Sequence, residues 1–199
     1  IMRYFQKAFR RSGIDIAYTE GFSPHPVMSF AAPLGVGLES DGEYLDVELN
    51  APADMTEIKE KLNQQMAEGM EVLSAVALPE KSKSAMASVA AAGYYIAFRN
   101  EFTPPCGWQE AIEKFLEKDR IMVKKQTKKS MMEIDLKPAV YDFRLSSYRE
   151  KDCLYLMVNA SSAGNVKPGM VVEALFQEME LPFDPAWLMV TREDTYLNR

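Results

Sequence analysis

Residues 89–99 read VAAAGYYIAFR, a mostly apolar run that predicts a strand. A helical pattern follows in WQEAIEKFLEK (108–118), where apolar residues recur on one side. Three strands are predicted next, at residues 121–127, 140–147 and 153–160. A helix opened by a proline follows at 168–179, and a last strand at 187–197. This order of strand, helix, strands, helix and strand is that of a ferredoxin-like βαββαβ unit.

The first part of the chain repeats this order without an opening strand. It begins with an amphipathic helix in IMRYFQKAFRRSGI (1–14), and a second helix starts at a capping box formed by Asp54 and Glu57. A hairpin turn is predicted at SDGE (40–43). The strand patterns are IDIAY (14–18), VMSFAAP (27–33), EYLDVEL (43–49) and MEVLSAVAL (70–78).

Both parts together predict an α+β fold of two ferredoxin-like (βαββαβ) halves. The halves are residues 1–80 and 88–199, and KSKSAMAS (81–88) is the linker. The first half lacks its opening strand in this chain, which predicts either a chain cut from a longer protein or a strand supplied elsewhere. Without that strand, its sheet has an exposed edge or a gap in its middle.

The composition bounds the class of protein. With 199 residues, 47% of them hydrophobic, the chain can bury a sizeable core. No apolar run reaches the roughly 20 residues that cross a bilayer, and the start resembles no signal peptide, so we expect a cytoplasmic protein without a membrane partner. Cys106 and Cys153 lack CxxC spacing and His25 is the only histidine, so we expect no metal site and no cofactor in this chain.

Positive charge gathers in two segments of a chain whose net charge is −6. In RYFQKAFRR (3–11), basic residues recur at i, i+4 and i+7 on one helical face; they are Arg3, Lys7 and Arg10, with Arg11 beside them. In KDRIMVKKQTKK (118–129), the basic residues singled out are Lys124, Lys125, Lys128 and Lys129. Segregated charge of this kind attracts anionic partners, and both segments predict contact with RNA phosphates.

The strand at 89–99 also carries aromatic residues. Tyr94, Tyr95 and Phe98 offer surfaces on which RNA bases could stack. The sequence has no clear RNP pattern, however. The alternative is that the aromatic side chains lie in the core and the basic segments form a solvated face.

His25 lies between Pro24 and Pro26, which restrict the backbone of the loop GFSPHP. As a functional residue it is a general base or an RNA contact, with Ser23 and Glu20 as the nearest helpers. The alternative, which we favour, is a histidine that fixes the loop through hydrogen bonds. We then expect the loop to lie beside the first helix and to form one partner-facing surface with its basic residues.

Two glycine-bearing loops remain. PLGVGLESDG (33–42) lacks the GxGxxG spacing, so its glycines are interpreted as turn residues. SAGNVKPG (162–169) runs into a helix whose first N–H groups could hold a phosphate. We favour simple capping of that helix by Asn165.

The segments MRYFQKAFRRSGI (2–14) and AYTEGFSPHPVMSFAAPLGVGLESDGEYLDVEL (17–49) resemble a radical-SAM-linked bacterial domain of unknown function. That domain occurs alone or joined to the C-terminal side of a radical SAM protein. KKQTKKSMMEIDLKP (124–138) and GNVKPGMVVEALF (164–176) are similar to its later landmarks. In the family, a strand and a His-Leu-Asp-like triplet precede the first helix, and both are absent here. The resemblance implies a radical SAM protein or domain as partner.

The sequence as a whole indicates an accessory domain that binds RNA or an RNA-bearing assembly and works with a radical SAM enzyme. We expect no catalysis of its own and identify no small-molecule substrate. One alternative is an RNA-directed enzyme that uses His25 as acid or base; another is a protein-docking domain. A continuous basic surface favours the first interpretation, a cleft with His25 and a carboxylate the second, and an exposed apolar patch the third.

Overall fold

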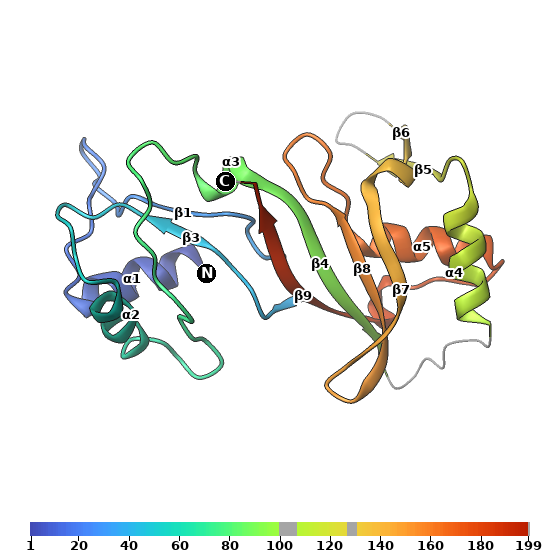
Figure 1. The fold of residues 1–199 in the computed structure, drawn as a ribbon, viewed down its shortest axis with the longest axis horizontal. Coiled ribbons are helices and arrows are strands. Elements are labelled where there is room, and N and C mark those ends of the chain that lie inside the picture. The colour runs from blue at the N-terminus through green and yellow to red at the C-terminus, as the bar shows by residue number, and fades with distance from the viewer. Residues whose placement is uncertain (100–106, 127–130, 199) are drawn as a thin grey trace. The chain divides into compact units, whose positions relative to one another are not determined.

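The computed structural model describes residues 1–99, 107–126 and 131–198, with only the backbone at 125–126, and shows the predicted α+β fold (Figure 1). The chain divides into two compact units. Unit 1 is Ile1–Phe30 with Leu45–Ala85, and unit 2 is Ala31–Tyr44 with Met86–Arg199. The chain therefore passes from one unit to the other three times.

The two main helices of unit 1 begin and end where the sequence signals lie. Helix α1 (Met2–Ser12) ends at Gly13, whose φ of 68° lies in the left-handed region that favours glycine. Helix α2 (Met55–Asn63) begins after Asp54. The Asp54 carboxylate accepts bonds from two backbone N–H groups of the first turn, at 2.7 and 3.3 Å. This is the capping that the sequence predicts.

A short antiparallel ribbon completes unit 1. Strands β1 (Met28–Phe30) and β3 (Leu45–Val47) pair with each other. The apolar face of α1 packs on this ribbon, with the Phe5 ring edge-on to Phe30 at 5.3 Å between centroids. The buried centre of the unit consists of Ala8, Phe9, Ile14, Ile16 and Leu62.

Two strand predictions in unit 1 are wrong. At 14–18 the structure has isolated bridges instead of a strand. Residues 70–78 form no strand, and Leu73 and Val76 are 64% and 72% exposed. Alternating apolar residues form a strand only beside a partner with free backbone groups, and no described segment pairs with 70–78. A ferredoxin-like form of this half therefore stays a prediction.

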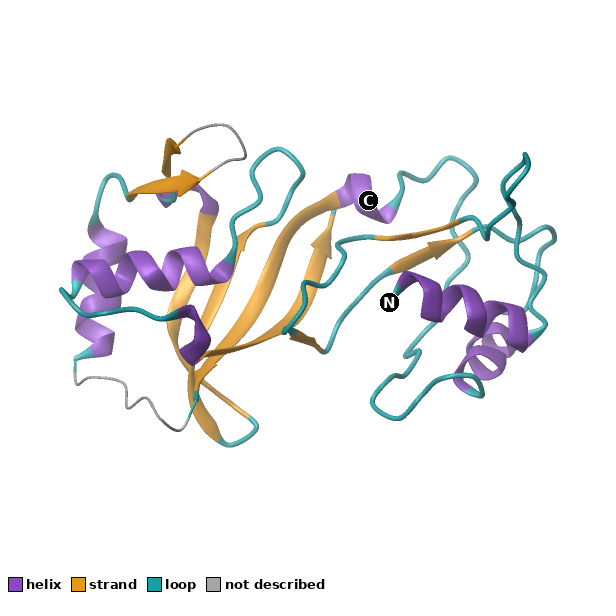
Figure 2. Ribbon diagram, turned by 180° about the vertical axis from the view of Figure 1, so that it is seen from behind, coloured by secondary structure: helices purple, strands orange, loops and turns teal. Residues whose placement is uncertain are grey.

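Unit 2 is built on a sheet with the strand order β2-β9-β4-β8-β7, in which β2 (Glu39–Ser40) is a short edge strand. Its long strands are β4 (Val89–Phe98), β7 (Val140–Tyr148), β8 (Lys151–Asn159) and β9 (Leu188–Leu197). Each is antiparallel to its neighbours among these four. Helix α4 (Trp108–Glu117) follows β4 and helix α5 (Pro168–Glu178) follows β8, and Figure 2 shows them on one face of the sheet. These long elements follow the predicted βαββαβ order.

A hairpin is inserted between α4 and β7. It consists of β5 (Met122–Gln126) and β6 (Met131–Asp135), which pair antiparallel as a separate ribbon. The sequence patterns predict only the first of these strands. The remaining short elements of the described chain are α3 (Ala85–Ser88) and 3-10 turns at Lys137–Ala139 and Pro185–Trp187.

The core of unit 2 lies between the sheet and its two helices. Trp108, Phe115 and Phe176 project from the helices and are at most 6% exposed. They pack with Ile96 and Leu156 of the central strands, which are 0% exposed. Because side chains alternate between the two faces of a strand, every second side chain of β4 and β8 points into this core.

Residues 31–44 belong to unit 2 although both flanking segments belong to unit 1. Within them β2 (Glu39–Ser40) pairs parallel with β9. The predicted hairpin turn at 40–43 is therefore wrong. Arg192 of β9 is 5% exposed and binds this segment. Its Nη1 donates to the Ala32 carbonyl at 2.8 Å and to the Glu43 carboxylate at 2.8 and 3.0 Å.

Candidate nucleic-acid and partner-binding surfaces

A basic stripe runs along α1 in unit 1, as the sequence predicts. Arg3, Lys7 and Arg10 are exposed, and none of them makes an ion pair with a carboxylate in the described part of the chain. Arg11 is also exposed, but its Nε and Nη2 donate to Gln65 at 3.2 and 3.3 Å. Three cationic groups are thus available to a partner.

The rest of α1 is fixed in place, so the stripe is presented by a rigid helix. The opposite face carries Ala8 and Phe9, which are 0% and 2% exposed. The Tyr4 hydroxyl accepts a bond from the backbone N–H of Ala67 at 2.5 Å. Because the helix is held by packing and by this bond, an anion that binds the stripe orders the cationic side chains but not the helix backbone.

The loop around His25 is a small hydrogen-bonded hairpin. Tyr18 and Pro26 form an antiparallel bridge at its base. The backbone N–H of Thr19 donates to the His25 carbonyl at 2.9 Å, and that of His25 donates to Thr19 Oγ1 at 3.2 Å. The imidazole Nδ1 lies 3.2 Å from Thr19 Oγ1 and 3.3 Å from the Ser23 carbonyl. The histidine therefore helps to fix the loop.

The tip of this loop exposes an aromatic ring that the sequence analysis did not single out. Phe22 has a relative exposure of 112%, and Ser23 and His25 beside it are also exposed. In Figure 1 the loop projects at the upper left, on the side of β1 and β3 away from α1. The loop and the basic stripe therefore lie on different sides of unit 1, and the prediction that they form one surface is wrong.

The second basic segment is described only in part. Lys124 is exposed on β5, and for Lys125 the structure describes the backbone alone. Lys128 and Lys129 lie outside the described residues. The structure thus places one lysine side chain of this group.

The aromatic residues of β4 divide between two faces of the sheet. Tyr94, which is 5% exposed, lies in the core, and Phe98 packs on it with its ring 5.4 Å from that of Trp108. The Tyr94 ring is therefore closed to a base, and the half-buried Phe98 ring is engaged by the core. Tyr95 stacks on Tyr148 on the other face, with 4.5 Å between ring centroids. The predicted stacking surface is therefore reduced to Tyr95.

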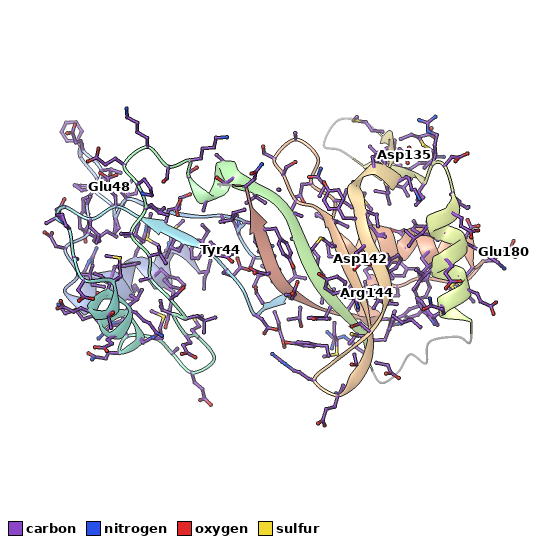
Figure 3. The ribbon with its side chains drawn as sticks, in the orientation of Figure 1. Tyr44, Glu48, Asp135, Asp142, Arg144 and Glu180 are labelled. Carbon is purple, nitrogen blue, oxygen red and sulfur yellow. The ribbon has the colours of Figure 1, made fainter. Side chains whose placement is uncertain are left out.

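A polar cluster surrounds Tyr95 on this second face. The Glu193 carboxylate accepts from the hydroxyls of Tyr155 at 3.2 Å and Tyr196 at 2.9 Å. The guanidinium of Arg144, labelled on β7 in Figure 3, lies 4.4 Å from the centroid of the Tyr155 ring. The strand alternation that separates Tyr95 from Tyr94 is the signal that could have revealed this cluster.

The tyrosines of this cluster act as hydrogen-bond donors. Burial and the hydrogen bond to Asp41 raise the pKa of Tyr148 to about 12. Burial also raises the pKa of Tyr155, as do its hydroxyl neighbour Tyr196 and the Glu193 carboxylate. Both hydroxyls are protonated at neutral pH, so neither acts as a base there. The cluster stabilises the sheet face through bonds that are already satisfied.

The glycine-bearing loop at 162–169 leads into α5, but its predicted cap is wrong. The N-cap residue of α5 is Lys167, which makes no side-chain cap bond, and Pro168 occupies the first turn. Asn159 holds the start of the loop by accepting bonds from the Ser161 backbone at 2.9 Å and its hydroxyl at 2.7 Å. Proline at this position suits a helix start, because its missing N–H has no partner there in any case.

Within residues 1–99, 107–126 and 131–198, no three His, Cys, Asp or Glu side chains gather as metal ligands do. No helix in the same residues is long and apolar enough to cross a bilayer.

Comparison with known proteins identifies one family. No curated protein matches the sequence. The sequence model of a bacterial family matches residues 1–168, which is most of the 199-residue chain and includes α1, the His25 loop and β5. The protein therefore belongs to the family described as "Uncharacterized protein conserved in bacteria (DUF2344)".

Proposed function

We propose that this protein is an RNA-binding accessory domain that works in the cytoplasm with a radical SAM enzyme. The observation that carries the RNA part is the row of unpaired cations Arg3, Lys7 and Arg10 on a rigid helix of an acidic protein. The first and last of them lie about 10 Å apart along the helix axis. Such a row can neutralise several phosphates of one strand. The radical SAM partner is supported by the resemblance of residues 2–49.

The test is binding of a fluorescein-labelled single-stranded RNA to the full chain, followed by fluorescence anisotropy at several salt concentrations. Changing Arg3, Lys7 and Arg10 to Gln should weaken binding. It should also reduce the slope of log K against log salt by about 2, because each phosphate contact on a single strand contributes about 0.7.

The control is a variant with the same net charge. Lys81, Lys83 and Lys151 are exposed cations that do not belong to α1, and changing them to Gln should leave the slope unchanged. Equal effects of the two triple variants would mean that only net charge matters. Absence of RNA binding by the wild-type chain would refute the RNA proposal.

Docking to a protein partner is a second candidate function, and the exposed Phe22 favours it. An aromatic side chain on a hydrogen-bonded loop that is stiffened by two following prolines loses little freedom when it enters a pocket of a partner. Changing Phe22 to Ser should weaken binding to the purified radical SAM protein of the same bacterium. The equally exposed Val36, with a relative exposure of 108%, provides the control variant Val36→Ser. Equal binding by wild type and Phe22→Ser would exclude the loop as the docking site.

The enzyme interpretation has less support. Catalysis by a histidine usually needs a carboxylate that orients the ring. The described contacts of the His25 ring are with Thr19 and Ser23, which position it within its own loop. We therefore assign His25 a structural role in the proposed function.

A further inference from the structure

The surface of unit 2 is hollowed between α5 and the chain from Lys118 to Lys124. A depression of about 590 Å³ lies between β5 and α5, and one of about 170 Å³ adjoins it. The two share Met122, Ala174 and Gln177 in their walls. They therefore form one continuous groove along α5.

The larger depression brings together two segments that are far apart in the sequence. Lys124 comes from the second basic segment and Lys167 from the glycine-bearing loop before α5. Both lysines are exposed, and neither makes an ion pair with a described carboxylate. Two free ammonium groups thus border one depression.

The cations of the smaller depression are already paired. Lys118 forms an ion pair with Glu178, and Arg120 Nε lies 3.4 Å from Asp135 Oδ2. An anion bound there would have to compete with these carboxylates. The free positive charge of the groove therefore lies at its Lys124 and Lys167 end.

The lining of the larger depression is apolar in part, and this apolar part is named the floor. Met122 is 47% exposed, and Val123 and Met170 are half-buried beside it. Methionine is flexible and polarisable, so it adapts to flat apolar ligands. A ligand that suits this site combines negative charge with an apolar, planar surface.

We propose that this groove binds single-stranded RNA, with phosphates at Lys124 and Lys167 and a base on the Met122–Met170 floor. The inference rests on the proposed function and gives it a site in unit 2. A single strand fits better than a duplex, because its bases are free to leave the stack and contact a protein surface. A duplex presents mainly its phosphates and would leave the apolar floor without a partner.

Glu173 provides an internal check because its carboxylate also lines the depression and is exposed. A carboxylate close to a bound phosphate opposes binding. Replacing it with the neutral Gln should tighten RNA binding, whereas replacing the two lysines should weaken it. If the groove does not bind RNA, neither replacement should change the affinity for RNA.

The experiment measures anisotropy of a fluorescein-labelled oligouridylate with the full chain. Lys124→Gln combined with Lys167→Gln should weaken binding several-fold and reduce the salt slope by about 1.4, at about 0.7 for each phosphate contact. Glu173→Gln should tighten binding. An unlabelled duplex of the same length should compete less well than the unlabelled single strand.

The control pair Lys81→Gln with Lys83→Gln removes the same charge outside the groove and should bind as wild type does. If wild type binds the strand and the groove variants bind equally well, the groove inference is overturned while the proposed function stands. A groove that takes an acidic peptide would give that result. If wild type binds no RNA, the proposed function itself fails.

Discussion

The ion pair between the buried Arg192 and the partly exposed Glu43 should be a main support of unit 2. The change Glu43→Gln keeps the shape of the side chain but removes the charge that faces the guanidinium. Arg192 then retains the Ala32 carbonyl, and its Nε has no hydrogen-bond partner among the described residues. The variant therefore leaves a buried cation without its counter-charge.

The expected loss follows from burial. The Arg192 side chain is 6% exposed and that of Glu43 is 26% exposed. Removing one partner of a buried pair costs about 3–5 kcal/mol in free energy of unfolding. Since Glu43 is partly hydrated and Gln can still accept a bond, we expect about 3 kcal/mol. By contrast, Glu39→Gln breaks an exposed pair with Arg149, at 3.4 Å, and should cost less than about 1 kcal/mol.

Urea unfolding followed by tryptophan fluorescence measures this loss, because both tryptophans, Trp108 and Trp187, belong to unit 2. The double variant Arg192→Met with Glu43→Leu should recover most of the stability, since well-packed apolar residues often replace a buried pair without loss. The reasoning would be refuted if Glu43→Gln and Glu39→Gln had equal effects. It would also be refuted if the double variant were less stable than Glu43→Gln alone.

Three further changes test other features. Gly93→Ala should lower the free energy of unfolding, measured by urea unfolding, by about 1–3 kcal/mol, because a Cβ there would lie 2.8 Å from the Tyr155 hydroxyl. No loss of stability would mean that the Tyr155 side chain moves aside freely. Tyr148 has a raised pKa of about 12, so its contribution to stability is complete below pH 10 and decreases as pH rises through 12. Tyr148→Phe should therefore flatten this part of the plot of unfolding free energy against pH. An unchanged plot would contradict the raised pKa of Tyr148. Asp54→Ala removes the cap of α2 and should cost about 1 kcal/mol, measured by thermal unfolding monitored by circular dichroism, whereas Asp54→Ser should restore most of it.

Local signals account for the elements that the sequence predicts. The helix at α1, its end at Gly13 and the Asp54 cap depend on residues a few positions apart, and all three are found. The strands of unit 2 follow from long apolar or alternating runs in the same way. Each of these structures is determined largely by its own segment.

The features that the sequence does not predict depend on distant partners. β2 has two residues, too few to show a period, and it pairs with a strand at the other end of the chain. Segment 70–78 has a strand pattern but no described partner, so the pattern has no sheet to join. The groove requires Lys124 and Lys167 to meet through the packing of β5 and α5. Pairing and packing over long distances leave no local mark in the sequence.

The net charge of the chain also differs from the charge near individual surfaces. A net charge of −6 argues against general attraction of nucleic acids. The carboxylates of Asp135 and Glu178, however, face Arg120 and Lys118, so each pair cancels locally. Opposite charges a few ångströms apart produce little field beyond the Debye length of about 8 Å at physiological salt. The cations of α1 and of the groove that make no ion pair with a described carboxylate can therefore attract an anion locally, although the net charge of the chain is negative.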